Sequence, residues 1–308
     1  MIIIIGGTGF IGKHLCCAIQ KSGKKAICYS NNPDIEFLSE NSPSTKGRPI
    51  SKLFADNENN ILEEAQAVIY LASRSYPALI NNSASFEVEN NIRPAIKAFD
   101  HILSLNNKAK IIYLSSGGTI YGSGHTIPIK ESSPLKPSTP YSFGKIAIEQ
   151  YLQLLNASKN IDYTILRASN PVGKWHANPR QGFIGASITN IKLGKPLEIF
   201  GDGETIRDYI DADELSSAII KIVDNHDASK NKIWNIGSGI GASLNDIATN
   251  LKKITGSDFQ VNYTASRNVD LRYNVLDCSK ISKELNWKSE LILNDILSKA
   301  WNESNVTN

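Results

Sequence analysis

The chain has 308 residues and a formal net charge of +3, with 41% hydrophobic and 20% charged residues. This length and composition suit one large or two unequal domains around a substantial core. No block of Lys and Arg suggests nucleic acid as a partner, and no apolar run approaches the roughly 18 residues that cross a bilayer. The four cysteines and five histidines lack metal-ligand spacing, so we expect no metal site and a reduced, cytoplasmic setting.

The first two thirds of the chain alternates short β-rich runs with longer runs of helical periodicity. Strands are expected at residues 2–5, 26–29, 68–71, 111–115 and 163–167, and helices at 10–21, 87–105 and 141–156. The polar segment 39–49 is expected to be a loop. The alternation predicts an α/β fold, a doubly wound parallel sheet with helices on both faces.

The pattern changes after Arg167, where turn residues crowd the sequence and the alternation becomes irregular. We therefore expect a smaller C-terminal lobe. A helix at 211–225 and a strand at 234–236 are expected to return to the main sheet. The predicted division assigns residues 1–168 and about 205–236 to the main domain, and 169–204 and 237–308 to the lobe.

A glycine-rich turn, Gly6-Gly7-Thr8-Gly9-Phe10-Ile11-Gly12, connects the first expected strand to the first expected helix. Glycines at this spacing let the backbone turn sharply and approach a phosphate, and free N–H groups at a helix N-terminus favour the anion. This order of elements predicts a dinucleotide site in a Rossmann-type domain. Its expected contacts are Gly6, Thr8, Gly9, Phe10, Ile11 and Gly12.

The end of the second expected strand leaves the choice between NAD and NADP open. The acid that would bind the adenosine ribose of NAD is missing, and the neutral Ser30 and Asn31 stand there instead. No arginine beside them selects the phosphate of NADP. The expected cofactor is NAD, with NADP as the alternative. Asp56 is a candidate for hydrogen bonding the adenine, and the remaining expected cofactor contacts are Leu71, Ala72 and Ser73.

Residues 141–145, Tyr-Ser-Phe-Gly-Lys, put a phenol and an ammonium group four residues apart on one helical face. Tyrosine has an ordinary pKa near 10, and ionising it near neutral pH requires about 4 kcal/mol of differential stabilisation. Lys145 and a positive nicotinamide ring can supply this. Because the strand before the pair ends in Ser115-Ser116, we expect Tyr141, Lys145 and Ser116 to form a catalytic group.

Further segments follow the glycine turn in order over nearly the whole chain. They are Leu-Ser-Ser-Gly-Gly-Thr-Ile-Tyr-Gly at 114–122, the Tyr141/Lys145 pair, Arg-Ala-Ser-Asn-Pro-Val-Gly at 167–173, Phe-Gly-Asp-Gly at 200–203, Arg-Asp-Tyr at 207–209 and Asn-Ile-Gly-Ser-Gly at 235–239. Together they resemble the UDP-glucose 4-epimerase branch of the extended short-chain dehydrogenases/reductases, in the NAD-dependent epimerase/dehydratase family. The resemblance implies that Tyr141 is the base and acid at carbon 4 of a hexose. It also implies that Lys145 holds the nicotinamide ribose and that Ser116 hydrogen bonds the same sugar oxygen.

One position departs from the family pattern. In many members of the family that this chain resembles, the catalytic Ser or Thr stands where this chain has Gly117. Ser116 is therefore expected to take the role, with Thr119 as the substitute candidate. Related 4,6-dehydratases carry an Asp-Glu pair after their catalytic Thr. Gly117-Gly118 lacks those groups, so dehydration is not expected.

The resemblance also implies a nucleotide diphosphate sugar as the partner, bound by the smaller lobe. Arg207 and Arg267 would bind its phosphates, since the planar guanidinium fork matches phosphate oxygens. Asn170 would contact the same diphosphate, and Asn274 would limit the bulk on the sugar ring. A homodimer formed through the helices at 87–105 and 141–156 is the expected assembly.

Three functions remain open from the sequence. The first is a nucleotide-sugar 4-epimerase that keeps NAD bound. The second is an NAD(P)H-dependent 4-keto reductase of a nucleotide 6-deoxy-4-keto-hexose, for example a dTDP sugar, which the neutral Ser30 and Asn31 favour slightly. The third is a non-catalytic dinucleotide sensor, against which the presence of both Tyr141 and Lys145 argues.

Overall fold

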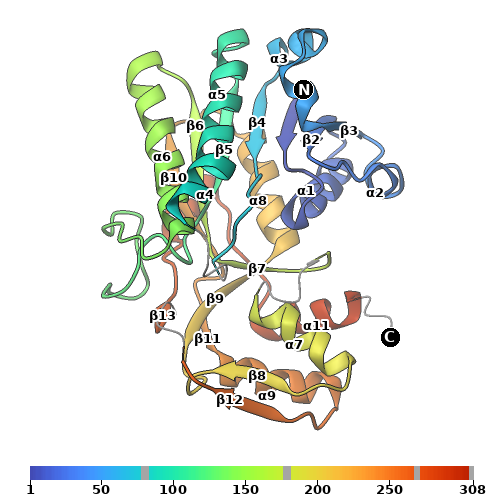
Figure 1. The fold of residues 1–308 in the computed structure, drawn as a ribbon, viewed down its shortest axis with the longest axis vertical. Coiled ribbons are helices and arrows are strands. Elements are labelled where there is room, and N and C mark those ends of the chain that lie inside the picture. The colour runs from blue at the N-terminus through green and yellow to red at the C-terminus, as the bar shows by residue number, and fades with distance from the viewer. Residues whose placement is uncertain (78–82, 176–181, 267–270, 305–308) are drawn as a thin grey trace.

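The computed structural model describes residues 1–77, 83–175, 182–266 and 271–304, and Figure 1 shows a larger part above a smaller one. A seven-stranded sheet forms the larger part. Its spatial order is β10 (Lys232–Ile236), β6 (Tyr163–Ala168), β5 (Lys110–Ser116), β4 (Ala67–Tyr70), β1 (Ile2–Ile5), β2 (Ala26–Ser30) and β3 (Thr45–Pro49). All neighbours pair in parallel. The doubly wound parallel fold is therefore confirmed.

The strand order reverses between β1 and β4, because β2 and β3 continue on one side of β1 while β4, β5 and β6 continue on the other. In open α/β sheets, such a reversal opens a crevice at the carboxyl ends of the strands, where ligands bind. The residues after Ile5, Tyr70 and Ser116 all lie at this edge.

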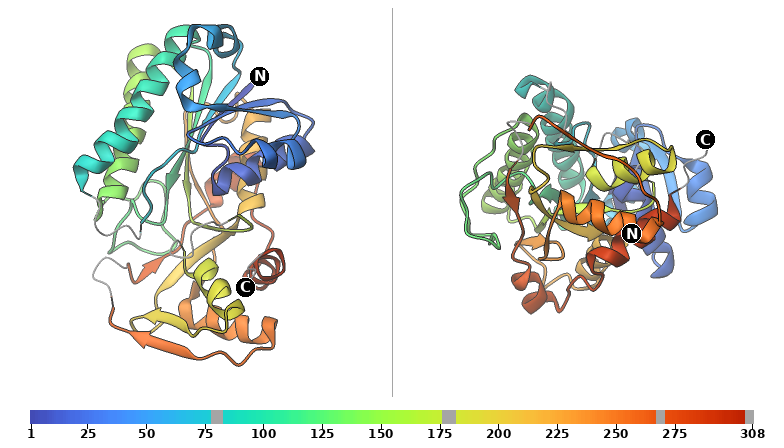
Figure 2. Two further views of the ribbon diagram at one scale, coloured as in Figure 1. Left: turned by 45° about the vertical axis from the view of Figure 1, so that its right-hand side comes forward. Right: turned by 90° about the horizontal axis from the view of Figure 1, so that it is seen from below.

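Helices cover both faces of the sheet, as the side view in Figure 2 shows. Alternate residues of β1 point to opposite faces, so Ile2 and Ile4 belong to one core and Ile3 and Ile5 to the other. The first core is closed by α1 (Phe10–Lys21), α2 (Ile35–Asn41), α8 (Ala212–Asp224) and α10 (Ser279–Leu285). The second is closed by α3 (Asn59–Glu63), α5 (Arg93–Leu105) and α6 (Pro140–Lys159).

One sequence expectation is corrected here. Residues 39–49 are not a loop, because they contain the end of α2 and the edge strand β3, which is exposed or only partly buried after Thr45. The helix expected at 87–105 is present without a break, and consists of the end of α4 (Ala84–Glu87), a π-helical segment η3 (Val88–Ile92) and α5. Pro94, near the start of α5, has no N–H to donate, which suits the altered hydrogen bonding of the π-helical segment.

The smaller part contains two small sheets. In the first, β9 (Ile206–Asp211) pairs with β7 (Asn170–Val172), β11 (Gly241–Ser243) and β13 (Tyr273–Asn274). In the second, β8 (Leu197–Phe200) pairs with β12 (Val261–Thr264). Three helices, α7 (Phe183–Lys192), α9 (Leu244–Thr255) and α11 (Leu293–Glu303), share their apolar core. The expected division placed residues from about 205 in the main domain; among the described residues, β9 pairs with β7, β11 and β13 of the smaller part.

The chain then returns to the larger part. The helix α8 packs against α1, and β10 becomes the edge strand beside β6. Later, α10 contributes Ile281 and Leu285 to the larger core before α11 ends the described chain in the smaller part. The two short 3-10 helices, Ile50–Phe54 and Asp56–Glu58, follow β3.

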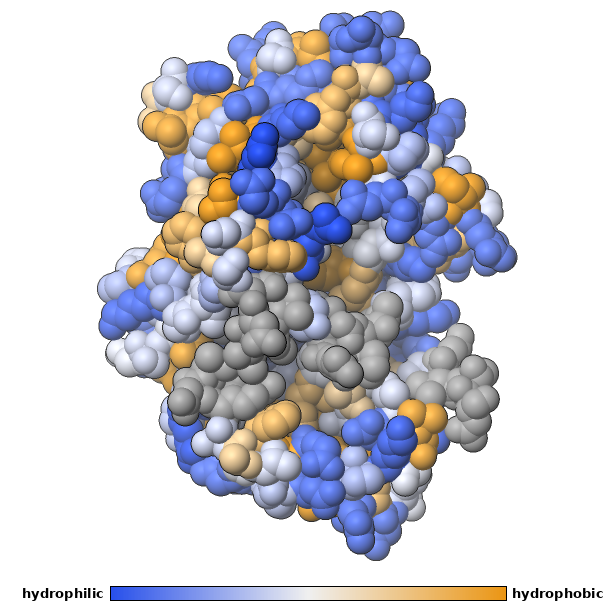
Figure 3. All heavy atoms as spheres, in the orientation of Figure 1, coloured by the Kyte–Doolittle hydropathy of each residue, from blue (hydrophilic) through white to orange (hydrophobic). Residues whose placement is uncertain are grey.

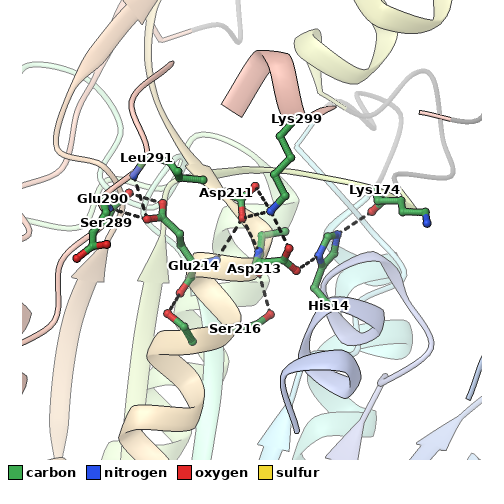
Figure 4. Close-up of polar contacts among 12 residues, drawn as sticks. His14, Lys174, Asp211, Asp213, Glu214, Ser216, Ser289, Glu290, Leu291 and Lys299 are labelled. Carbon is green, nitrogen blue, oxygen red and sulfur yellow. Dashed lines mark hydrogen bonds and ion pairs between the residues drawn. The ribbon is translucent and has the colours of Figure 1, made fainter. Parts of the chain in front are cut away.

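A charged network joins the two parts (Figure 4). Lys299 of α11 lies 2.8 Å from a carboxylate oxygen of Asp211 and 2.7 Å from one of Asp213, at the start of α8. On its other side, Asp213 lies 2.5 Å from Nδ1 of His14 in α1. The second ring nitrogen of His14 lies 2.8 Å from the carbonyl oxygen of Lys174. The network therefore ties α1 and α8 to α11.

The face drawn in Figure 3 is mainly hydrophilic, with separate apolar patches. Within the described part of the chain, no helix combines the length and the apolar character that crossing a membrane requires.

Candidate active site

The glycine turn packs tightly against the neighbouring strand ends. Gly6 has φ +91°, and a Cβ added to it would lie 2.7 Å from the backbone nitrogen of Ala72. A Cβ on Gly12 would lie 2.5 Å from Cα of Gly7. Side chains at these positions would collide with the backbone of the turn and of the neighbouring strand end, so glycine is needed for the tight turn and the close packing of α1. Gly9 is the N-cap of α1 and makes no side-chain cap hydrogen bond, so the helix N-terminus suits an anion.

The other expected cofactor residues lie around this turn. Leu71 and Ala72 border Gly6, and Ser73 follows them on the surface, where its hydroxyl donates to the carbonyl oxygen of Ser75. Oγ of Ser30 accepts a hydrogen bond of 3.3 Å from the backbone N–H of Thr8. Phe10 and Ile11 form the first turn of α1. Asn31 and Asp56 are exposed, at the end of β2 and in the second 3-10 helix.

The three expected catalytic side chains meet at the carboxyl end of β5. Tyr141 lies in the first turn of α6, which Thr139 caps, and Ser116 is near enough to its phenol to lower the pKa of Tyr141 against the larger effect of burial. The hydroxyl of Thr119 donates to Oγ of Ser116 at 3.1 Å. Nζ of Lys145 lies 5.6 Å from the centre of the Tyr141 ring and donates to the carbonyl oxygen of Leu114 at 2.9 Å. The arrangement can pass a proton between the phenol and a hydroxyl group beside Ser116.

Burial dominates the charge states of this group. It raises the pKa of Tyr141 to about 12, an effect that Ser116 opposes and Glu87 reinforces. Burial also lowers the pKa of Lys145 to about 8, against the charges of Glu87 and Glu149. The sequence expectation is that Lys145 and a positive nicotinamide ring together lower the pKa of Tyr141. In the protein alone, burial is the largest effect and raises this pKa.

The expected substrate residues come together on the smaller part. Nδ2 of Asn170, on β7, donates to the carbonyl oxygen of Asp208 at 2.8 Å. Arg207, on β9, is paired in register with Asn274 of β13. Nδ2 of Asn274 donates to the carbonyl oxygen of Gly117 at 3.1 Å, so β13 reaches the catalytic strand end. Arg267 lies outside the described residues.

The model for the NAD-dependent epimerase/dehydratase family matches residues 2–237, which include the glycine turn, Ser116 and the Tyr141/Lys145 pair. The chain belongs to this family. Curated relatives include a putative UDP-glucose 4-epimerase of Methanocaldococcus jannaschii, which is 27% identical over 98% of this chain and 97% of its own length. A dTDP-4-dehydro-6-deoxyglucose reductase of Escherichia coli is 26% identical over 97% of this chain and 95% of its own.

Among solved structures, the present chain is similar over its whole fold to the UDP-glucose 4-epimerase of Thermotoga maritima, whose structure was determined with UDP-glucose. The TM-score is 0.87 and the identity 26%, with 98% of this chain and 97% of the other covered. The likeness includes the smaller part as well as the doubly wound sheet.

A buried polar layer that the sequence patterns did not predict lies beneath the catalytic group. Arg167 and Glu149 form an ion pair of 2.8 Å, and the hydroxyl of Ser115 donates to the same carboxylate. Glu149 lies four residues after Lys145 on the same helical face, a spacing that could have indicated it. Glu87 reaches the group from α4, and no local pattern marks that approach. In the described part of the chain, no group of three or more His, Cys, Asp or Glu residues could hold a metal ion.

Proposed function

We propose that the protein is a nucleotide-sugar 4-epimerase that uses bound NAD. The observation that carries the proposal is the meeting of Ser116, Tyr141 and Lys145 at the carboxyl end of β5, on the same sheet edge as the glycine turn. The structure presents this group next to residues of the smaller part, so a sugar between the two parts would face Tyr141. The 4-epimerase relatives at 26–27% identity support the same reading.

The residues present fit a nicotinamide dinucleotide. The backbone at Gly6 and Gly12 leaves no room for side chains and leaves the start of α1 open to a pyrophosphate. Lys145 has ammonium protons beyond the one donated to Leu114, and these can bind ribose hydroxyls. When bound, the dinucleotide supplies a reversible hydride acceptor for carbon 4 of the sugar.

In the proposed reaction, the phenol oxygen of Tyr141 takes the proton of the sugar hydroxyl at carbon 4 and later returns it. Ser116 donates a hydrogen bond to the same sugar oxygen, with Thr119 holding Ser116 in place. Lys145 stabilises the ionised phenol by its charge. Removing a positioned acid and base of this kind costs about 10²–10⁴-fold in rate.

The proposed substrate contacts come from the smaller part. Asn170, Arg207 and Arg267 would bind the diphosphate, whose charges need cationic or hydrogen-bonding partners. Asn274 would border the sugar ring, because its side chain is buried beside Gly117. A side chain of this size leaves room for N-acetylated hexoses.

The test uses the purified protein with UDP-glucose or UDP-N-acetylglucosamine and no added cofactor, followed by NMR of the products. Formation of the 4-epimer is expected, and denaturation of the same sample should release NAD. Absence of both the epimer and a dinucleotide would contradict the proposal.

A second candidate function is a 4-keto reductase of a nucleotide 6-deoxy-4-keto-hexose. Ser30 favours it, because a neutral residue at the end of β2 tolerates NADP as well as NAD. The Escherichia coli reductase relative supports it as well. Strict dependence on added NAD(P)H, with consumption of a 4-keto sugar, would replace the epimerase proposal by this one.

We also propose a cytoplasmic homodimer built on α4 to α6. Val88, Phe143 and Leu154 expose 40%, 44% and 60% of their surfaces on these helices, and a partner copy would cover such apolar side chains. All four cysteines are free thiols, as a reducing compartment requires. Sedimentation equilibrium should give twice the chain mass, and replacing Phe143 and Leu154 by Glu should give a monomer.

A further inference from the structure

A buried acid reaches the helix that carries the catalytic pair. Glu87, the last residue of α4, is only 1% exposed. A Cβ added to Gly144 would lie 2.7 Å from Oε2 of Glu87, so the missing side chain at position 144 lets the carboxylate approach α6. Gly144 lies between Tyr141 and Lys145. The carboxylate therefore meets α6 at the turn that holds both groups.

Hydrogen bonds hold Glu87 in this place. Nδ2 of Asn91, in the π-helical segment η3, donates to Oε2 of Glu87 at 2.7 Å and to Oγ of Ser75 at 2.9 Å. Oδ1 of Asn91 accepts from the backbone N–H of Arg74 at 2.8 Å. Asn91 thus links the acid to the loop after β4, which borders the glycine turn.

The second oxygen of this carboxylate is exceptional. Oε1 of Glu87 is buried and has no hydrogen-bond partner within the residues that the structure describes. A buried carboxylate whose oxygen lacks a hydrogen-bond partner lowers the stability of the fold unless a positive charge lies near it. Lys145 is the cation at this turn, since Arg167, the other cation buried beneath α6, is paired with Glu149.

Within the residues that the structure describes, three further groups face the catalytic pair: Glu149, Tyr113 and Glu87. Glu149 faces it from α6 itself, with its charge offset by Arg167. The ring of Tyr113, on β5, lies 5.1 Å from Nζ of Lys145, and burial keeps the pKa of Tyr113 well above its ordinary value. Glu87 approaches from α4. It raises the pKa of Lys145 against the larger lowering by burial, and it raises the pKa of Tyr141 in addition to the larger raising by burial.

We propose that Glu87 is a positioning residue that supplies the buried counter-charge of Lys145 and thereby sets the pH range in which Tyr141 acts as base and acid while Lys145 keeps its charge. It contacts neither substrate nor cofactor and acts through the pair. The inference rests on the proposed function, because the acid–base role of Tyr141 is part of it.

The test compares pH profiles of kcat for the wild type and Glu87→Gln. Glutamine keeps the size and can still accept from Asn91, while it removes the charge. Without that charge, Tyr141 ionises and Lys145 loses its proton at lower pH. We expect both limbs of the profile to move to lower pH by about one unit, the size typical of one nearby charge.

The matched control is Glu89→Gln. Glu89 is an exposed acid two residues away that pairs with Arg93, so its loss removes the same charge at the surface. Its profile should superimpose on that of the wild type. An E87Q profile with lower kcat but unmoved limbs would overturn the proposal and leave Glu87 a structural link only. If E87Q does not fold, Gly144→Ala displaces the carboxylate and should shift the limbs in the same direction.

A readout without turnover separates this inference from the proposed function. Ionisation of Tyr141 can be followed by NMR of tyrosine labelled at Cζ, with the signal assigned by Tyr141→Phe. The signal should titrate at lower pH in E87Q than in the wild type. A wild type that is inactive on nucleotide sugars would refute the proposed function, whereas an unshifted Tyr141 titration would refute the role of Glu87.

Discussion

Leu276 occupies the space that a side chain at position 117 would need. A Cβ added to Gly117 would lie 2.6 Å from Cδ1 of Leu276 and 2.8 Å from the carbonyl oxygen of Arg167. The position that the family resemblance gives to a catalytic hydroxyl is therefore closed in this chain by Leu276, which packs with Ile120, Tyr121 and Ile129.

Restoring the common family residue should therefore be harmful. We expect Gly117→Ser to lower the free energy of unfolding by about 1–3 kcal/mol through overpacking, and not to raise kcat. Gly118→Ser is the matched control, because a Cβ there would be 3.7 Å from its nearest neighbour, Oδ1 of Asn170. Urea denaturation of both variants measures the difference. Equal stabilities would contradict the closed position.

Removing the phenol hydroxyl should abolish turnover while leaving the fold intact. We expect Tyr141→Phe to reduce kcat by about 10²–10⁴-fold, because the proton at carbon 4 then has no positioned acceptor. The melting temperature and the amount of dinucleotide released on denaturation serve as controls and should be unchanged. Full activity of this variant would remove the proposed mechanism.

Adding an acid at the end of β2 should sharpen the cofactor preference. In Ser30→Asp, a carboxylate can accept from the ribose hydroxyl of NAD and would repel the phosphate of NADP. We expect the ratio of Kd for NADP to Kd for NAD to rise by about tenfold, equivalent to about 1.4 kcal/mol. Isothermal titration with both dinucleotides tests this, and an unchanged ratio would place Ser30 away from the ribose.

The charged network of His14, Asp213 and Lys299 in Figure 4 should make the free energy of unfolding fall in acid. Burial disfavours the charge of Asp213, but hydrogen bonds from His14 and Lys299 outweigh it and hold the pKa of Asp213 well below its usual range. Such a group stabilises the fold above its unfolded pKa of about 4, and the contribution disappears as the pH falls toward the folded pKa.

We expect Asp213→Asn to cost about 1 kcal/mol at pH 7, a modest value because 42% of this side chain is exposed to screening solvent. The difference from the wild type should shrink below pH 4. Urea denaturation across this range measures it, and a difference independent of pH would show that charge is not its source.

Much of the fold follows from local patterns. The apolar run Ile2–Ile5 predicts β1 with its observed bounds, because a strand buried on both faces has an unbroken apolar sequence. The helical spacing of apolar residues in Phe10–Lys21 likewise predicts α1. The edge strand β3 was missed, since partial exposure lets its residues be polar. Its pairing with β2 depends on distant residues that no local window contains.

The candidate site likewise contains residues that local patterns predict and residues that they do not. Spacing within one helix indicated Tyr141 and Lys145, and the end of one strand indicated Ser116. Glu87 and Leu276 could not be predicted, because each reaches the site through packing between elements far apart in the sequence. The raised pKa of Tyr141 depends likewise on burial, which the motif alone does not contain.

The passage of the chain between the two parts also limits how the molecule can be divided. Segments at β10 and α10 belong to the larger core although β9, β11 and α11 on either side belong to the smaller part. A single protease cut between β7 and α10 would leave both fragments contributing to both cores. Nicked protein should therefore migrate as an intact species until denatured, and neither part should be obtainable as a contiguous expression fragment.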